Sequence, residues 1–145
     1  MDKRTWEDAK IGEELGFIQY KLTSENISRH LLAIEDDNPW YIQESPFVGP
    51  IAPPLITNSQ YERLYVRYFS DEQGFFHAKT EVEIINPLFL GKLVTVRGSI
   101  TDKYIRRERK YIVIETTVTD EDGREISRSK NSLASIKKFP DLMNK

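Results

Sequence analysis

The chain has 145 residues, of which 39 % are hydrophobic and 30 % charged, and its formal net charge is −2. A chain of this length can bury one sizeable core, so we expect a single domain over residues 1–145. The charge balance gives no general attraction to nucleic acid or to an anionic membrane, and the lack of cysteine excludes disulfides and thiolate metal sites. No signal-like or membrane-length apolar run is present, which predicts a cytoplasmic location.

The chain begins with the pattern of a strand followed by a helix. Residues 15–22 favour a strand because they include aromatic and β-branched side chains. Thr23 is then placed to cap a helix, since its hydroxyl can accept a hydrogen bond from the first helical turn. Pro39 disfavours helical geometry at the residue before it, so this helix must end near Asp36.

A long loop and a second helix follow. Residues 38–53 are rich in proline and lack apolar periodicity, and a loop of this length inside a domain is often functional. Pro54 suits the first position of a helix. An apolar stripe at i, i+3, i+4 and i+7 continues the helix to about Phe69. We expect this to be the longest helix and to lie at the centre of the fold.

The second half of the chain has the pattern of antiparallel strands. Residues 78–84 alternate apolar and charged side chains, which predicts one buried and one solvated face. Further strands are predicted at residues 93–105, 110–119 and 124–138, with a tight hairpin at residues 120–123. This order of elements predicts an α+β domain in which a curved antiparallel sheet wraps around the long central helix.

Four sequence motifs then point to one family. The hexamer Asp-Asp-Asn-Pro-Trp-Tyr at residues 36–41 is followed by Gly-Pro-Ile-Ala-Pro-Pro at 49–54, by Asn-Pro-Leu-Phe-Leu-Gly-Lys at 86–92 and by Asp-Gly-Arg at 122–124. In this order they resemble the motifs of MaoC-like (R)-specific enoyl-CoA hydratases and 3-hydroxyacyl dehydratases, over roughly residues 10–138. The resemblance implies a single hot-dog fold and an acyl thioester, carried by coenzyme A or acyl carrier protein, as substrate or ligand.

The family chemistry adds water across the α,β double bond of an acyl thioester, or removes it. An Asp and a His hold the water and transfer a proton. A backbone N–H at the start of the central helix polarises the thioester carbonyl, where negative charge develops. The resemblance also implies an acyl tunnel, usually formed with a partner subunit. It implies no metal and no cofactor besides the thioester.

The hexamer matches this pattern except at its last position. Asp36 corresponds to the catalytic Asp, while Asn38 and Pro39 correspond to residues that shape the substrate-binding turn. Tyr41 stands where the family has its catalytic His. A phenol titrates near pH 10 and is a poor base at neutral pH, whereas an imidazole titrates near neutrality. Asp36 and Asn38 could instead only form a turn, and Tyr41 could be a loop aromatic that packs on the core.

The second departure lies at the start of the central helix. Of the substrate-binding positions Ala52, Pro53 and Pro54, the two prolines stand where active relatives usually carry His-Gly, whose glycine supplies the polarising N–H. Proline has no backbone N–H, and the loss of one such donor costs about 2.7–4 kcal/mol at the barrier. The combination resembles the degenerate, non-catalytic hot dog of two-part dehydratases.

We therefore expect a family subunit that lacks full catalytic machinery and pairs with an active hot-dog partner to shape the acyl site. One alternative is an active hydratase or dehydratase with a variant site, using Asp36 with Tyr41 or His77, because His77 offers acid/base chemistry and could border the thioester. The other alternative is an acyl-CoA thioesterase. Each hypothesis expects a homodimer or a heterodimer, since a lone hot dog leaves a sheet edge open.

One further motif is a basic turn with interleaved tyrosines at residues 103–111. Such a patch can contact nucleic acid. The near-neutral charge and the position between two strands favour a solvated turn. A third interpretation is contact with the phosphates of coenzyme A or with an acidic carrier protein.

Overall fold

The computed structural model describes residues 3–43, 45–47, 49–58, 60–70 and 74–140. In chain order the elements are the 3-10 turn η1 (Trp6–Asp8), β1 (Glu14–Lys21), α1 (Ser24–Ile34), the 3-10 turn η2 (Pro39–Tyr41), α2 (Gln60–Val66), β2 (Phe75–Ile84), β3 (Leu93–Arg106), β4 (Arg109–Asp120) and β5 (Glu125–Ser135). Among these residues, no helix is long and apolar enough to cross a membrane.

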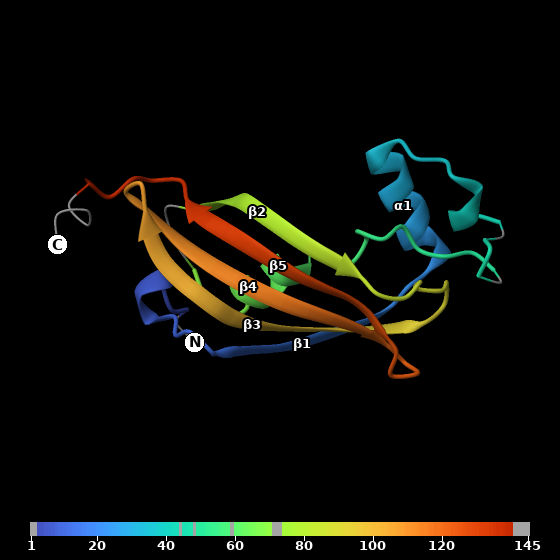
Figure 1. The fold of residues 1–145 in the computed structure, drawn as a ribbon, viewed down its shortest axis with the longest axis horizontal. Coiled ribbons are helices and arrows are strands. Elements are labelled where there is room, and N and C mark those ends of the chain that lie inside the picture. The colour runs from blue at the N-terminus through green and yellow to red at the C-terminus, as the bar shows by residue number, and fades with distance from the viewer. Residues whose placement is uncertain (1–2, 44, 48, 59, 71–73, 141–145) are drawn as a thin grey trace.

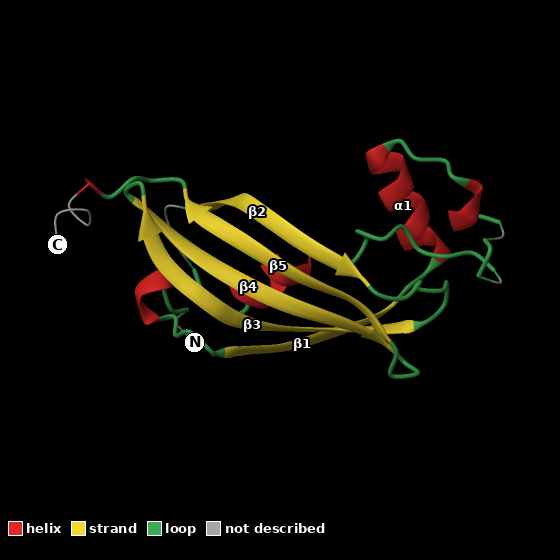
Figure 2. Ribbon diagram, viewed as in Figure 1, coloured by secondary structure: helices red, strands yellow, loops and turns green. Residues whose placement is uncertain are grey.

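All five strands form one antiparallel sheet in the order β1-β3-β4-β5-β2. The sheet is long and curved, α2 lies against one of its faces, and α1 stands at one end (Figures 1 and 2). The predicted antiparallel sheet is confirmed, because each of the expected strand segments pairs with a neighbour. The two edges of the sheet are β1 and β2.

The core lies between α2 and the inner face of the sheet. In β4, Ile112, Ile114 and Val118 are buried whereas Glu115 and Thr117 are exposed, as expected for a strand with one wet face. The branched aliphatic core side chains with no exposed area are Leu15, Leu22, Leu64, Val94, Val96, Ile100, Ile112 and Ile114. Their burial is the main stabilising contribution to the fold.

The helix α2 is shorter than the sequence predicted. It has 7 residues, Gln60–Val66, against 11 in α1. Residues 54–58 are turns, in which the N–H of Ile56 bonds to the carbonyl of Pro53 at 3.1 Å and that of Asn58 to Leu55 at 3.1 Å. These are i→i+3 bonds, and the poor helix formers at 57 and 58 do not favour the wider α-helical turn. The prediction of a long helix from Pro54 is therefore wrong in length.

The short helix nevertheless lies close to the sheet. A Cβ added to Gly98 of β3 would lie 2.8 Å from Cδ1 of Leu64, which no native contact tolerates without movement. Gly98 thus allows α2 to approach the strand, and Leu64 fills the space that a side chain would occupy. This contact fixes the position of the helix over the middle of the sheet.

The helix α1 is capped as predicted. The hydroxyl of Thr23 accepts from the N–H of Asn26 at 3.1 Å, and the Asn26 side chain accepts in return from the N–H of Thr23 at 3.2 Å. Ile27 and Leu31 are buried, but Ile34, the third member of the predicted stripe, is 50 % exposed. Only the first two turns of α1 therefore pack on the domain.

The strand β2 differs most from expectation. Its alternation predicts that the face with Thr80 and Ile84 is buried. Thr80 is nevertheless exposed, although its hydroxyl bonds to the side chain of Asn131, and Ile84 is 47 % exposed. The reason is its place at the edge of the sheet, where it pairs only with β5. Both faces of a long edge strand are consequently open to solvent in this chain.

Candidate functional site

The Asp36 loop, residues 36–41, is held by two consecutive side-chain turns. The carboxylate of Asp36 accepts from the N–H of Asn38 at 3.0 Å, and the amide oxygen of Asn38 accepts from the N–H of Trp40 at 3.0 Å. Asx turns of this kind set the direction of the chain after a helix. One oxygen of each predicted site residue therefore shapes the loop itself.

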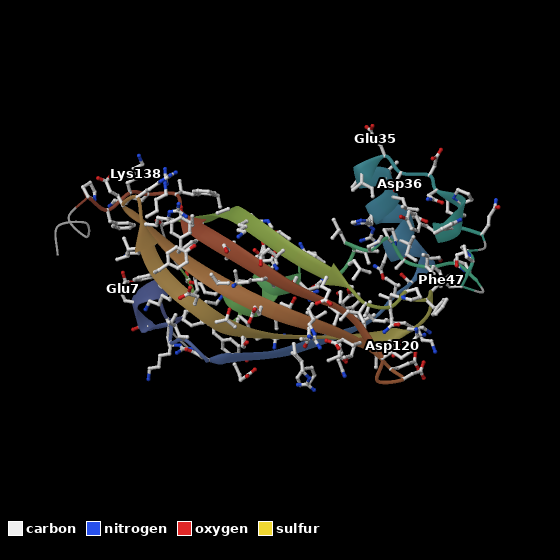
Figure 3. All side chains as sticks on the ribbon, in the orientation of Figure 1. Glu7, Glu35, Asp36, Phe47, Asp120 and Lys138 are labelled. Atoms are coloured by element: carbon white, nitrogen blue, oxygen red, sulfur yellow. The ribbon has the colours of Figure 1, made fainter. Side chains whose placement is uncertain are left out.

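The backbone of the same loop ends the helix α1. Glu35 adopts the left-handed conformation with φ 55°, and the N–H of Asp36 bonds to the carbonyl of Leu31 at 3.0 Å. Asp36 thereby lies at the end of α1, on the side of the molecule that also holds Phe47, while Glu7 and Lys138 lie at the opposite end (Figure 3). Its position is fixed by local geometry.

Tyr41 lies at the end of η2, and its ring packs against the hydrophobic core. The side chain is half-buried, and within the described residues its hydroxyl makes no hydrogen bond to Asp36. The N–H of Tyr41 bonds to the carbonyl of Asn38 at 3.1 Å. This geometry is that of an aromatic that anchors the loop to the domain.

His77 lies far from this loop. It is inside β2 rather than before it, at a bulge near the strand's first residues, and β2 runs from there toward α1 (Figure 1). The exposed imidazole ring is hydrogen-bonded to the hydroxyl of Thr80, and its centroid lies 5.3 Å from the ring centroid of Tyr61. The structure therefore does not bring His77 to Asp36 within one chain.

The segment 51–54 runs between the Asp36 loop and the turn that precedes β3. The N–H of Ile51 donates to the carbonyl of Trp40 at 3.0 Å, and the N–H of Ala52 donates to the carbonyl of Leu88 at 2.7 Å. Pro53 and Pro54 have no N–H. Every backbone donor that exists in this segment is thus already used within the protein.

A cavity of about 400 Å³ borders this segment. Its wall is mostly apolar and consists of Phe47, Ile51, Ala52, Pro53, Pro54, Ile56, Thr57, Ile84, Ile85, Asn86, Pro87, Leu88 and Ile126. We call it the apolar cavity. A space of this size and character suits the apolar part of a small ligand.

The sequence motifs anticipate only part of this cavity. The predicted residues Ala52, Pro53 and Pro54 line it, whereas Asp36 and Tyr41 are not among the described wall residues. Phe47, Ile84, Ile85 and Ile126 were missed, because they come from segments far apart in the chain. The one available signal was the pair Ile84-Ile85 directly before Asn86-Pro87, where an exposed strand end is unusually apolar.

The antiparallel sheet and the helix α2 define a hot-dog domain, with the apolar cavity beside the turns that precede the helix. The family model of the FAS1-like dehydratase domain region matches residues 9–129. The chain belongs to this dehydratase family.

Solved structures agree on the fold. A monoamine oxidase regulatory protein from Archaeoglobus fulgidus is 17 % identical, with a TM-score of 0.79, over 93 % of this chain and 97 % of that one. A MaoC-like dehydratase from Rhodospirillum rubrum is 20 % identical, with a TM-score of 0.72, over 91 % and 96 %. The 3R-hydroxyacyl-ACP dehydratase complex HadBC from Mycobacterium tuberculosis is 14 % identical, with a TM-score of 0.68, over 83 % and 97 %. No curated protein sequence matches this chain.

Proposed function

We propose that this chain is a hot-dog subunit that binds an acyl thioester in its apolar cavity and pairs with a second hot-dog subunit that carries the catalytic Asp and His. The chain contributes the shape of the acyl site, and its partner contributes the chemistry. The observation that carries the proposal is the use of every N–H between Ile51 and Pro54 within the protein.

Hydration of an enoyl thioester places negative charge on the thioester oxygen, which needs a donor preorganised at that position. In the segment 52–54, where the family resemblance locates this donor, Ala52 has already given its N–H to the carbonyl of Leu88 and the two prolines have none. The lost donor alone corresponds to about 10²–10³-fold in rate. The apolar wall beside it remains able to bind an acyl chain.

The Asp36 loop supports the same conclusion. The carboxylate of Asp36 accepts a hydrogen bond from Asn38, and Tyr41 packs on the core where the family resemblance expects a histidine. A phenol is a poor proton acceptor at neutral pH. The loop keeps the shape of the family motif while its last residue lacks the base.

The open edge of the sheet supports the pairing. The strand β2 has 10 residues and pairs on one side only, and the apolar side chains of Phe76, of Ile84 and of Ile85 directly after the strand are exposed by 42 %, 47 % and 38 %. The unpaired backbone groups of a long edge strand are a ready site for a second chain. The similar HadBC structure is a complex, which accords with a two-subunit assembly.

The test is an assay of the purified chain alone with crotonyl-CoA, followed by loss of the absorbance of the conjugated double bond. We expect no turnover above the buffer blank, together with measurable binding of a saturated butanoyl thioester by calorimetry. Hydration at rates typical of enzymes would overturn the proposal and favour the active hydratase with a variant site. Release of free thiol would favour the thioesterase instead.

The oligomeric state is tested separately by sedimentation velocity. We expect the chain to form a dimer with an Asp/His-bearing hot-dog chain, and we expect Ile84→Lys to weaken it at least about tenfold, since a charge then replaces an exposed apolar side chain on the open edge. The matched control is Ile11→Lys, which changes a side chain that is 62 % exposed outside β2. A wild-type monomer at high concentration that also fails to associate with such a chain would rule out the pairing.

A further inference from the structure

A second depression lies between β1, α1 and α2, and we call it the basic groove. Its volume is about 570 Å³, and its wall consists of Tyr20, Lys21, Leu22, Asn26, Arg29, His30, Ala33, Ile56, Gln60 and Arg63. Three of these side chains are permanent cations, and no carboxylate belongs to the described wall. Since the whole chain carries a net charge of −2, such a concentration of positive charge is local.

Of the three cations of the groove, one is paired with a carboxylate. Arg29 forms an ion pair with Glu25 on the exposed face of α1, at 2.8 Å. Arg63 instead donates to the neutral amide oxygen of Gln60 at 2.9 Å, and no ion pair of Lys21 is found in the described residues. Two charges therefore remain available for an anion.

A phenol lies near one of these cations, Arg63. The hydroxyl of Tyr20 is buried and has no hydrogen-bond partner in the described part of the chain, and burial raises its pKa to about 12 while the charge of Arg63 lowers it. A buried donor without a partner costs about 1–3 kcal/mol. An acceptor atom bound by Arg63 that also reaches this hydroxyl would relieve the cost.

The basic groove adjoins the apolar cavity. Ile56 belongs to both walls, so one side chain separates the polar space from the apolar one. A ligand with an apolar part and a phosphate group at some distance can occupy both at once. The basic turn at residues 103–111 lacks this relation, because it joins β3 to β4 at the other end of the molecule from α1 (Figure 1).

We infer that the basic groove is an anion-binding site that takes a phosphate group through Arg63 and the Tyr20 hydroxyl, while Lys21, which follows Tyr20 in β1 and points to the other face, adds only longer-range attraction. The phosphate is either free or carried by a ligand whose apolar part lies in the apolar cavity. The second case rests on the proposed function, whereas the first does not.

The test is calorimetric binding of inorganic pyrophosphate to the full chain. We expect Arg63→Gln to weaken binding at least tenfold and Lys21→Gln to weaken it by no more than about threefold. Tyr20→Phe should weaken it about threefold without unfolding, since it removes only an unpartnered hydroxyl. The matched control is Arg106→Gln on the basic turn, which should leave the affinity within twofold. Absence of pyrophosphate binding, or an equal loss in the Arg106 variant, would overturn the site.

The two sources of phosphate are separated with one acyl group on two carriers. Butanoyl-CoA bears phosphates, and the butanoyl thioester of N-acetylcysteamine bears none. If the ligand carries the phosphate, Arg63→Gln weakens only the first; if the site takes free phosphate, both affinities stay unchanged while pyrophosphate binding is lost. Failure of the proposed function appears differently, as no binding of the N-acetylcysteamine thioester, and leaves the pyrophosphate result intact.

Discussion

The two parts of the candidate site differ in how their groups are used. In the Asp36 loop, the carboxylate of Asp36 and the amide of Asn38 bond to the loop's own backbone, and Tyr41 packs on the core. In the apolar cavity, about 400 Å³ remains open between the segment 51–57 and the end of β2. The contrast shows that the apolar cavity stays open, whereas the polar groups of the Asp36 loop hold the structure of the loop itself.

The largest effect is expected from a charge in the cavity wall. Ile85→Asp should weaken binding of the butanoyl thioester by about 30-fold, because an ionised carboxylate in an apolar wall must be desolvated when the ligand enters. Ile85 is 38 % exposed, so the empty protein should stay folded. Calorimetry gives the affinity, with Ile11→Asp as the control at an exposed site outside the cavity. Unchanged affinity would show that the ligand binds elsewhere.

The second effect distinguishes two roles of Tyr41, packing on the core and proton donation. Tyr41→Ala should lower the free energy of unfolding by about 1.5 kcal/mol, because a half-buried ring leaves the core. Tyr41→Phe should change it by less than about 0.5 kcal/mol, because the ring that packs on the core is kept. Urea unfolding measures both variants. A loss of hydration activity in Tyr41→Phe would instead identify the phenol as a proton donor.

A smaller effect is expected at Asn38. Asn38→Ala removes the acceptor for the N–H of Trp40 and should cost about 1 kcal/mol, the usual value for a lost capping side chain. Asn38→Asp keeps an acceptor oxygen and serves as the matched control, with a cost below about 0.5 kcal/mol. Urea unfolding again gives the values. Equal losses in the two variants would mean that the amide nitrogen, and not the oxygen, holds the loop.

Local patterns made the strands and the cap of α1 predictable. The alternation in β4 and the pair Thr23 and Asn26 act over a few residues, so the sequence alone contains them. The extent of α2 was not predictable in this way, because residues 54–58 form i→i+3 turns although the apolar pattern around them is also compatible with a helix. Periodicity reports which side chains share a face but not where tight turns replace the helix.

Topology decided the features that the sequence did not reveal. The exposure of β2 follows from its place at the sheet edge, which no pattern within the strand encodes. His77 lies far from Asp36 because β2 runs toward α1 and His77 stands near its start. Phe47 and Ile126 meet in one cavity although they come from a loop and from β5. The motif at 52–54 found the cavity only through family resemblance.

The smallest expected effect separates the two parts of the site most sharply. Asp36→Asn keeps the oxygen that accepts from the N–H of Asn38 at 3.0 Å and removes only the negative charge. If the carboxylate serves to shape the loop, the free energy of unfolding should change by less than about 0.5 kcal/mol, and the affinity for the butanoyl thioester should stay within twofold. A catalytic carboxylate would behave differently, because a neutral amide cannot accept the proton of an attacking water. Detectable hydration by the wild-type chain that disappears in Asp36→Asn would therefore restore the loop as an active site, and the apolar cavity would then hold a substrate of this chain itself.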